Sequence, residues 1–283
     1  MSLKFEPPKN NIIFTNSDKR KKSKRNKIIF NSTIFLIICG LIFFSIKFIS
    51  AWKKQNDSLK KSEIIYDNIN DRVEENETAT LPPDISTEEN ETQSPITIYQ
   101  KMNFDKLLEI NSEAYGWLEV TGLDISYPVA KAHDNDYYIG NSFNKEPSIN
   151  GSVFRDYRCT DNSDITILYG HRSADGSMFY PLDLLDSSYS NNKIVITREK
   201  TYIYDIWAVA HVPSAGDAYR INFSDSWSFA NYVDYIKSYA VNTTSHINNI
   251  SDASTLLMLS TCISTSKHPY RRVVCAYLTQ VIE

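Results

Sequence analysis

An uncharged apolar run close to the N-terminus constrains this chain more than any other feature of its sequence. Residues 28–46 (IIFNSTIFLIICGLIFFSI) carry no charge, and about 20 apolar residues are enough for a helix to cross a bilayer. Residues 19–27 (KRKKSKRNK) are strongly basic, and such a cluster remains in the cytoplasm. We therefore expect a cytoplasmic basic tail over residues 1–27 and a transmembrane signal anchor over residues 28–50.

Such an anchor would cross the cell membrane once and leave the rest of the chain on the extracytoplasmic side. The alternative is a cleaved secretory signal. The apolar run is long for a cleaved signal, and Ser50-Ala51-Trp52-Lys53 is a poor small-x-small cleavage site. A retained anchor is therefore the better interpretation.

The formal net charge of −4 hides two oppositely charged parts. Residues 1–54 contain 12 Lys and Arg against 2 Asp and Glu, whereas the remainder contains 18 against 32. A nucleic-acid-binding domain needs a basic face, so the acidic remainder argues against nucleic acid as a partner. Residues 51–98 are polar and acidic with few large apolar side chains, which predicts a flexible linker.

Beyond this linker, residues 99–283 are predicted to form one domain built mainly from β-strands. Helical periodicity is found in residues 178–185 and 226–239. Many short strands with few helices are typical of a closed or nearly closed barrel. Runs of β-forming residues between turn residues predict eight strands, over residues 117–120, 125–129, 152–154, 165–169, 193–197, 202–212, 255–259 and 273–282.

The cysteines indicate a reactive thiol. Cys39 lies inside the expected membrane span, and the remaining three are an odd number, so at least one external thiol is free. Cys159 lies in a polar loop, and Cys275 lies within an apolar strand and fits a small buried hydrophobic residue. Cys262 ends an apolar strand next to a loop, where reactive groups tend to be placed. No Cys and His spacing typical of metal ligands occurs, so we expect no structural zinc site.

A catalytic thiol needs a base or ion-pair partner and a group that stabilises an oxyanion. His171 follows an apolar strand and a turn glycine, so it also lies at a strand exit. His268 is only six residues after Cys262 and is the alternative. The pair Arg271-Arg272 opens the last predicted strand, just beyond the loop that follows Cys262.

Three groups of residues together resemble the sequence signature of class B sortases. LSTC, residues 259–262, is similar to the TLxTC-type motif of sortases, with a gap of nine residues to an arginine that begins a Val-Val strand. YGHRSADGSMF, residues 169–179, resembles the YGHxxxDGSMF region of class B members. Upstream segments follow one another as in that family, at residues 116–120, 127–129, 134–138 and 151–154.

The resemblance implies that residues 99–283 are a sortase catalytic domain with an eight-stranded sortase-type barrel. The protein would be a cysteine transpeptidase without a cofactor. Its Cys262 thiolate would cleave a C-terminal sorting signal, NPxTN-like or NPxTG-like, after threonine, with His171 as general acid and base. The implied partners are surface proteins that carry such a signal, and an amine of a peptidoglycan precursor or a pilin as acceptor.

The resemblance also assigns roles to the neighbours of the cysteine. In the family an arginine precedes a small residue of the last strand by five positions, and counting back from Ala276 gives Arg271, with Arg272 as the alternate. This arginine would bind the substrate carbonyl and the developing oxyanion. Ser260 and Thr261, within the cysteine motif, would contribute to substrate binding.

Two other functions fit the same residues. A membrane-anchored cysteine peptidase would form the same acyl-enzyme and pass it to water. A non-catalytic surface binding module would use Cys262 only for packing and leave His171 on the surface. An assay with and without an amine distinguishes the first alternative, and protection of the thiol from alkylation by a sorting peptide distinguishes the second.

Overall fold

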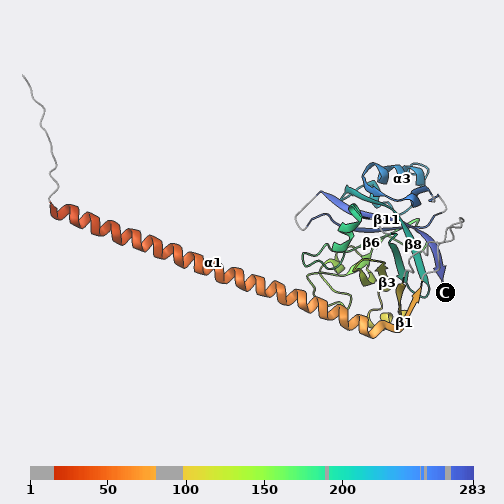
Figure 1. Ribbon diagram of the computed structural model, residues 1–283, viewed down its shortest axis with the longest axis horizontal. Coiled ribbons are helices and arrows are strands. Elements are labelled where there is room, and N and C mark those ends of the chain that lie inside the picture. Colours follow the sequence, from red (N-terminus) through yellow and green to blue (C-terminus); the bar gives the residue numbers. More distant parts are fainter. Residues whose placement is uncertain (1–15, 81–97, 189–190, 249, 252–253, 265–268) are drawn as a thin grey trace, which may run out of the picture. The chain divides into compact units, whose positions relative to one another are not determined.

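A computed structural model describes residues 16–80, 98–188, 191–248, 250–251, 254–264 and 269–283 (Figure 1). The chain divides into two compact units, Met1–Asp57 and Ser58–Glu283. Helix α1 (Asn16–Val73) begins in the first unit and ends in the second. The second unit contains the strands and is the part of the chain that forms the candidate site.

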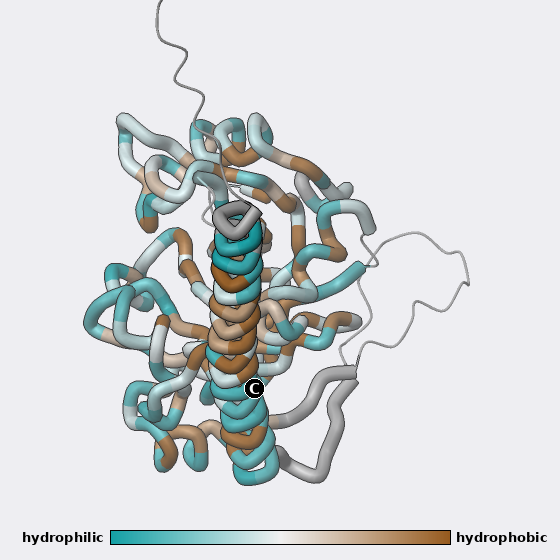
Figure 2. The backbone as a smooth tube through the Cα atoms, turned by 90° about the vertical axis from the view of Figure 1, so that its left-hand side faces the viewer, coloured by the Kyte–Doolittle hydropathy of each residue, from teal (hydrophilic) through white to brown (hydrophobic). Residues whose placement is uncertain are grey.

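Helix α1 contains the expected membrane anchor. Within the described residues it is the one helix long and apolar enough to cross a membrane, judged by length and composition over Lys24–Val73. Figure 2 shows its hydrophobic turns in brown along the middle of the helix. Residues 28–50 are helical throughout, as a segment inside a bilayer must be to satisfy its backbone polar groups.

The expected flexible linker differs in part from the structure, because residues 51–73 are helical. Ile65, Ile69 and Val73 recur every four positions, which places them on one face of α1. All three are buried, in a cluster that also contains Leu107 and residues of the barrel. The polar average composition of this segment hides the apolar stripe. The middle of the expected linker, residues 81–97, lies outside the described residues.

The burial of Ile65, Ile69 and Val73 predicts which N-terminal truncations leave the second unit stable. A fragment of residues 58–283 is expected to unfold cooperatively, whereas a fragment that begins at residue 99 should be clearly less stable. Burying one Ile or Val side chain contributes about 1.5 to 3 kcal/mol, and the shorter fragment lacks three such residues. Thermal unfolding of the two fragments measures the difference. Equal melting temperatures would show that residues 58–73 do not contribute to the folded domain.

The core of the second unit is a closed barrel of eight strands in mixed orientation. Neighbouring strands follow the order β11, β10, β6, β5, β4, β3, β7 and β8, and a further pairing of β8 with β11 closes the barrel (Figure 1). The strands are β3 (Ala114–Val120), β4 (Ser126–Lys131), β5 (Val153–Arg155), β6 (Ile165–Tyr169), β7 (Lys193–Thr197), β8 (Thr201–Pro213), β10 (Leu256–Cys262) and β11 (Tyr270–Ile282). Each overlaps one of the eight predicted strands, so the barrel prediction is confirmed.

Shorter elements surround this barrel. Strands β1 and β2 form an antiparallel pair, and β9 adds to the edge of β8; none of these three was predicted. Two helices cover residues that the periodicity had marked, α3 and the 3₁₀ helix η2. The remaining bounds are β1 (Glu74–Thr80), β2 (Ile98–Met102), α2 (Phe104–Ile110), η1 (Tyr137–Ile139), η2 (Tyr180–Asp186), η3 (Asp217–Tyr219), α3 (Phe229–Ser238), β9 (Ala240–Thr243) and η4 (Ser245–Asn248).

Strand β10 is buried on both faces. Leu257 and Leu259 belong to the cluster inside the barrel, whereas Leu256 and Met258 belong to a second cluster that includes Tyr232 of α3. Successive side chains of a strand point to opposite faces, so α3 covers the outer face of this strand. A strand covered on both sides reads as a continuous apolar run, as residues 256–259 do. The strand that ends in Cys262 is thereby held rigidly.

Candidate active site

Parallel pairing of β6 and β10 brings Cys262 and His171 to the same end of the barrel. The two strands are in register from Leu256 opposite Ile165 to Ser260 opposite Tyr169. Because both strands run in the same direction, the residues that follow these pairs emerge at one edge. Cys262 lies two residues beyond the last pair on one strand, and His171 lies two residues beyond it on the other.

The antiparallel partner β11 adds the arginines. Cys262 lies directly opposite Arg271, and Thr261 lies opposite Arg272. Directly opposed residues of an antiparallel pair have their Cβ atoms about 4.5 to 5.5 Å apart, so Arg271 begins next to the thiol. Nine positions in sequence separate Cys262 from Arg271, and the ladder of β10 and β11 brings the two residues back together.

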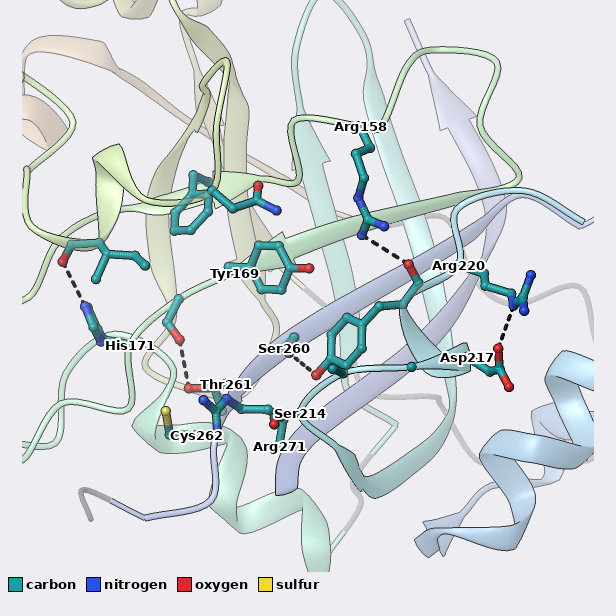
Figure 3. Close-up of a pocket in the computed structure, with 17 residues that line it drawn as sticks. Arg158, Tyr169, His171, Ser214, Asp217, Arg220, Ser260, Thr261, Cys262 and Arg271 are labelled. Carbon is teal, nitrogen blue, oxygen red and sulfur yellow. Dashed lines mark hydrogen bonds and ion pairs between the residues drawn. The ribbon is translucent and has the colours of Figure 1, made fainter. Parts of the chain in front are cut away.

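His171, Cys262 and Arg271 line a groove of about 780 Å³. In Figure 3, His171 and Cys262 lie toward one end of this groove, with Arg271 beside Cys262, and Arg158, Asp217 and Arg220 lie toward the other. Both predicted catalytic side chains and the preferred arginine therefore face one space. The remaining lining residues are Asn135, Ile139, Phe154, Tyr169, Gly170, Ser214, Ala215, Gly216, Tyr219, Ser260 and Thr261.

Ser260 and Thr261 line the groove, but their hydroxyls are bonded within the protein. The Thr261 hydroxyl donates to the Gly170 carbonyl over 2.8 Å, and the Gly170 N–H donates to the Ser260 carbonyl over 3.3 Å. These bonds tie the strand exit of Cys262 to that of His171. The Ser260 hydroxyl lies 3.0 Å from the Tyr219 hydroxyl, and burial raises the pKa of Tyr219 to about 12, so this phenol stays protonated.

The His171 ring is oriented by the main chain. Its Nε2 lies 2.9 Å from the Ile139 carbonyl oxygen (Figure 3). A carbonyl only accepts, so Nε2 carries the proton in this bond. The opposite nitrogen, Nδ1, is therefore the one available for exchanging a proton with a substrate. The alternative histidine, His268, lies outside the described residues.

The two arginines have opposite surroundings, as alternation along a strand requires. Arg271 lines the groove. Arg272 is only 4% exposed and forms ion pairs with Asp183 and Asp186 of η2, where its Nε donates to Asp186 over 2.8 Å. Arg172, the residue after His171, also binds Asp183, through Nη2 at 2.6 Å. The geometry therefore places Arg271 at the reacting end and Arg272 in a buried charge cluster.

This charge cluster predicts a pH dependence of stability. Burial raises the pKa of Asp186, but the hydrogen bonds and charge of Arg272, with a further contribution from His211, outweigh it and leave the pKa below its usual range. A depressed folded pKa gives stability that is complete above the unfolded value of about 3.9 and is lost as the pH falls through the folded value. Asp186→Asn should thus lower Tm at neutral pH, and the difference from wild type should shrink below about pH 4.

Melting curves of both proteins between pH 7 and pH 2.5 measure this effect. Asp161→Asn is a matched control, because Asp161 pairs with Arg155 at 3.4 Å but its side chain is 76% exposed. Exposed ion pairs contribute little, so the control should follow wild type at every pH. A Tm difference for Asp186→Asn that stays constant across this range would contradict the assigned ionisation.

The two other cysteines of the second unit, Cys159 and Cys275, lie away from the groove and share one core cluster. Cys159 is 2% exposed and Cys275 is 1% exposed. Burial raises the pKa of the Cys159 thiol and raises the pKa of Cys275 to about 12. Neither thiol lines the groove that contains Cys262. Cys275 is the buried hydrophobic residue that its strand predicted, and Cys159 is buried as well although its loop is polar.

Sequence reasoning missed the wall of the groove formed by residues 214–220. The Ser214 N–H donates to the Pro269 carbonyl over 2.8 Å, which fixes the start of this wall beside β11. Arg220 pairs with Asp217 over 2.7 Å and lies over the Trp227 ring. The sequence PSAGD at residues 213–217 does signal a turn. It gives no indication of which side of the barrel the turn covers.

Tyr169 and Arg158 both line the groove, and both bond to the buried carboxylate of Asp156. The Tyr169 hydroxyl donates to Asp156 over 2.8 Å, and Arg158 donates to the same carboxylate over 2.6 Å. Burial raises the pKa of Asp156, but the bonds from Arg158 and Tyr169 outweigh it and the net pKa is lowered. Arg158 also donates to the Tyr219 carbonyl over 3.1 Å. This bond links Arg158 to the wall formed by residues 214–220.

A closed barrel with a thiol, an imidazole and a guanidinium at one end of a groove has the groups that acyl transfer through a thioester requires. Residues 118–279 match the Sortase domain family. Sortase B of Listeria monocytogenes is 30% identical over 174 residues, which cover 59% of this chain and 70% of the relative. The chain belongs to the sortase family, and within it is a sortase B-type cysteine transpeptidase.

Solved structures agree with this assignment. The structure of Clostridium perfringens sortase B is 26% identical with a TM-score of 0.57, and the match covers 62% of this chain and 99% of that one. A Staphylococcus aureus sortase B–substrate complex is also 26% identical, with a TM-score of 0.55 and coverage of 62% and 84%. The non-catalytic surface module considered above is therefore set aside.

Proposed function

We propose that the protein cleaves a C-terminal sorting signal after threonine and transfers the released acyl group to an amine, with Cys262 as nucleophile, His171 as general acid and base, and Arg271 as oxyanion donor. The observation that carries the proposal is that these three residues line one groove, with Cys262 and His171 at the ends of parallel strands and Arg271 opposite Cys262 on β11. Each side chain comes from a different strand or strand exit of the barrel. Their arrangement is thus a consequence of the fold.

The proposed reaction has two steps. The Cys262 thiolate attacks the threonine carbonyl, the C–N bond breaks, and His171 gives a proton to the departing amine. The threonine acyl group is then bound to Cys262 as a thioester. An acceptor amine then attacks the thioester carbonyl, His171 takes its proton, and the thiolate is released as the new amide forms. Arg271 donates hydrogen bonds to the tetrahedral oxyanion in both steps, because its guanidinium is always charged.

We further propose that the substrates are surface proteins with an NPxTN-like or NPxTG-like signal. Support comes from the class B resemblance of residues 169–179 and from the similarity to a sortase B that was solved with its substrate. The acceptor would be an amine of a peptidoglycan precursor or of a pilin. Ser260 and Thr261 would contribute to substrate binding as part of the groove lining, since their hydroxyls are bonded internally.

The proposed location rests on the N-terminal part of the chain. Residues 28–50 would form a single-pass anchor, residues 1–27 a cytoplasmic basic tail, and the barrel would lie on the extracytoplasmic side. The apolar stretch of α1 and the preceding basic cluster support this arrangement. The proposed substrates and acceptor amines would then lie on the same side of the membrane as the barrel.

Mass spectrometry of the intact enzyme tests the reaction and the motif together. The protein is incubated with a small set of peptides that carry NPxTN, NPxTG or unrelated sequences, with and without triglycine as an amine. An adduct on Cys262 with a sorting peptide, and its conversion to a triglycine product, are expected. Release of free acid at the same rate with and without triglycine would instead support the hydrolytic peptidase.

A further inference from the structure

The orientation of the catalytic imidazole depends on a short turn. Nε2 of His171 donates to the carbonyl of Ile139 over 2.9 Å, and Ile139 is the last residue of the 3₁₀ helix η1. A three-residue 3₁₀ helix has little stability of its own. Whatever holds η1 therefore also holds the His171 ring.

The backbone of Gly151 lies directly against this turn. A Cβ at this position would come within 2.5 Å of the carbonyl oxygens of both Tyr138 and Ile139. Its φ of +57° is in the left-handed region that favours glycine. The next residue, Ser152, donates its N–H to the Tyr138 carbonyl over 2.9 Å. A displacement of Gly151 would thus displace the carbonyl that orients His171.

Gly151 is in turn held by helix α1 through Tyr66. The Tyr66 hydroxyl donates to the Gly151 carbonyl over 2.5 Å. Burial raises the pKa of Tyr66, so the phenol remains protonated and able to donate. The rest of the helix is fixed independently, because Ile65 and Ile69 on either side are buried in the core.

The ring of Tyr66 supports the loop on the other side of His171. It packs edge to face against Tyr127, with centroids 5.5 Å apart. The Tyr127 hydroxyl accepts the N–H of Met178 over 3.0 Å. Met178 closes the loop that begins at His171, since Arg172 bridges to it. Tyr66 therefore contacts both Gly151, which lies against η1, and Tyr127, which bonds to the loop that begins at His171.

We propose that Tyr66 is a positioning residue for catalysis, which orients the His171 imidazole through Gly151 and the carbonyl of Ile139. The proposal rests on the catalytic role proposed above for His171. It makes the part of α1 that begins at Ser58 a support of the active site. Proton exchange at Nδ1 then requires that this helix is docked.

The test is Tyr66→Phe in the full chain, purified in detergent. The substitution keeps the ring on Tyr127 and removes the hydroxyl that donates to Gly151 and also interacts with Ser152 and Phe143. Transfer of a peptide with an NPxTN or NPxTG motif to triglycine should show kcat reduced by about tenfold or more, with KM within about twofold. In ¹⁵N-histidine-labelled protein, the Nε2–H signal of His171, assigned with His171→Gln, should shift or broaden.

Ser62→Ala is the matched control. Ser62 lies one turn earlier on α1, is 1% exposed, and bonds to Ser148 over 3.0 Å, so this variant also removes one buried contact between helix and loop. It should lower Tm about as much as Tyr66→Phe but leave kcat and the His171 signal at their wild-type values. An equal loss of kcat in Ser62→Ala would overturn the specific role of Tyr66, as would an unchanged His171 signal in Tyr66→Phe.

The test of Tyr66 and the test of the proposed transpeptidation can fail independently of each other. If wild type forms no acyl adduct with any peptide, the sortase assignment of His171 fails. The ¹⁵N signal of His171 still reports whether Tyr66 orients the imidazole, because it needs no substrate. An active wild type with a normal Tyr66→Phe variant would overturn only the positioning role.

Discussion

Cys262→Ala is expected to abolish both cleavage of a sorting peptide and its transfer to an amine. The loss should be on the order of 10⁴-fold or more, because the thiolate that forms the covalent intermediate is missing and no other group takes its place. The barrel should remain folded, since Cys262 ends its strand at the groove rather than in the core. Equal far-UV circular dichroism and melting curves would show that only the chemistry was lost.

Cys159→Ala and Cys275→Ala are the matched controls. The attacking group must be a thiolate, and burial raises the pKa of both thiols. The Cys159 sulfur bonds to the Ile165 carbonyl over 3.5 Å, inside the core. Both variants should therefore keep cleavage and transfer within a few-fold of wild type, with some loss of stability.

The measurement is the rate of peptide cleavage and of product formation with triglycine for the three single variants. Alkylation by iodoacetamide gives an independent reading, because wild type and both controls should be labelled at Cys262. Retained turnover in Cys262→Ala would remove the central claim. A loss in Cys159→Ala at normal stability would assign the chemistry to a thiol that the structure buries.

The barrel was predictable because its strands carry their own signal. Seven of the eight runs are rich in β-branched and aromatic residues, and the eighth, residues 255–259, is a continuous apolar run. Strand β9 (Ala240–Thr243) carries no such signal: it has four residues, alternates between partly buried and exposed, and follows α3 directly. It forms because β8 offers a free edge, which is a long-range property.

The helical part of the linker could have been recognised from spacing instead of composition. Ile65, Ile69 and Val73 are four residues apart, which is a helical stripe. The surrounding Asp, Asn and Glu residues lower the average hydrophobicity and conceal it. Tyr66 lies beside this stripe, and its partner Gly151 is 85 residues away. No local pattern predicts such a pair.

The candidate site was predictable in its residues but only partly in its surroundings. Strand exits and motifs pointed to Cys262 and His171. The partners of Arg272 lie on η2, 86 and 89 residues away in sequence. The wall at residues 214–220 likewise reaches the groove only through tertiary packing. Cys262 and His171 lie in local sequence motifs, whereas the shape of the groove depends on residues that only the fold brings together.

Arg271→Lys is expected to reduce kcat/KM for transfer by about 10² to 10³, the cost of losing one oxyanion donor. Lysine keeps the charge but loses the planar fork that donates two parallel hydrogen bonds. Arg271 lies opposite Cys262 in the ladder and lines the groove, so in the proposed reaction its donors would face the carbonyl that Cys262 attacks. Folding should change little, because the Arg271 side chain is not part of the core.

Arg272→Lys provides the contrast, because the neighbouring side chain is buried on the opposite face. Its guanidinium donates to both oxygens of Asp186, and lysine cannot reproduce that pair. We expect a loss of about 1 to 3 kcal/mol in the free energy of unfolding, with kcat/KM within a few-fold of wild type. A severe loss of turnover in Arg272→Lys beside a near-normal Arg271→Lys would reverse the assignment. Mild losses in both would leave oxyanion stabilisation to backbone N–H groups near Cys262, since neither guanidinium would then act on the transition state.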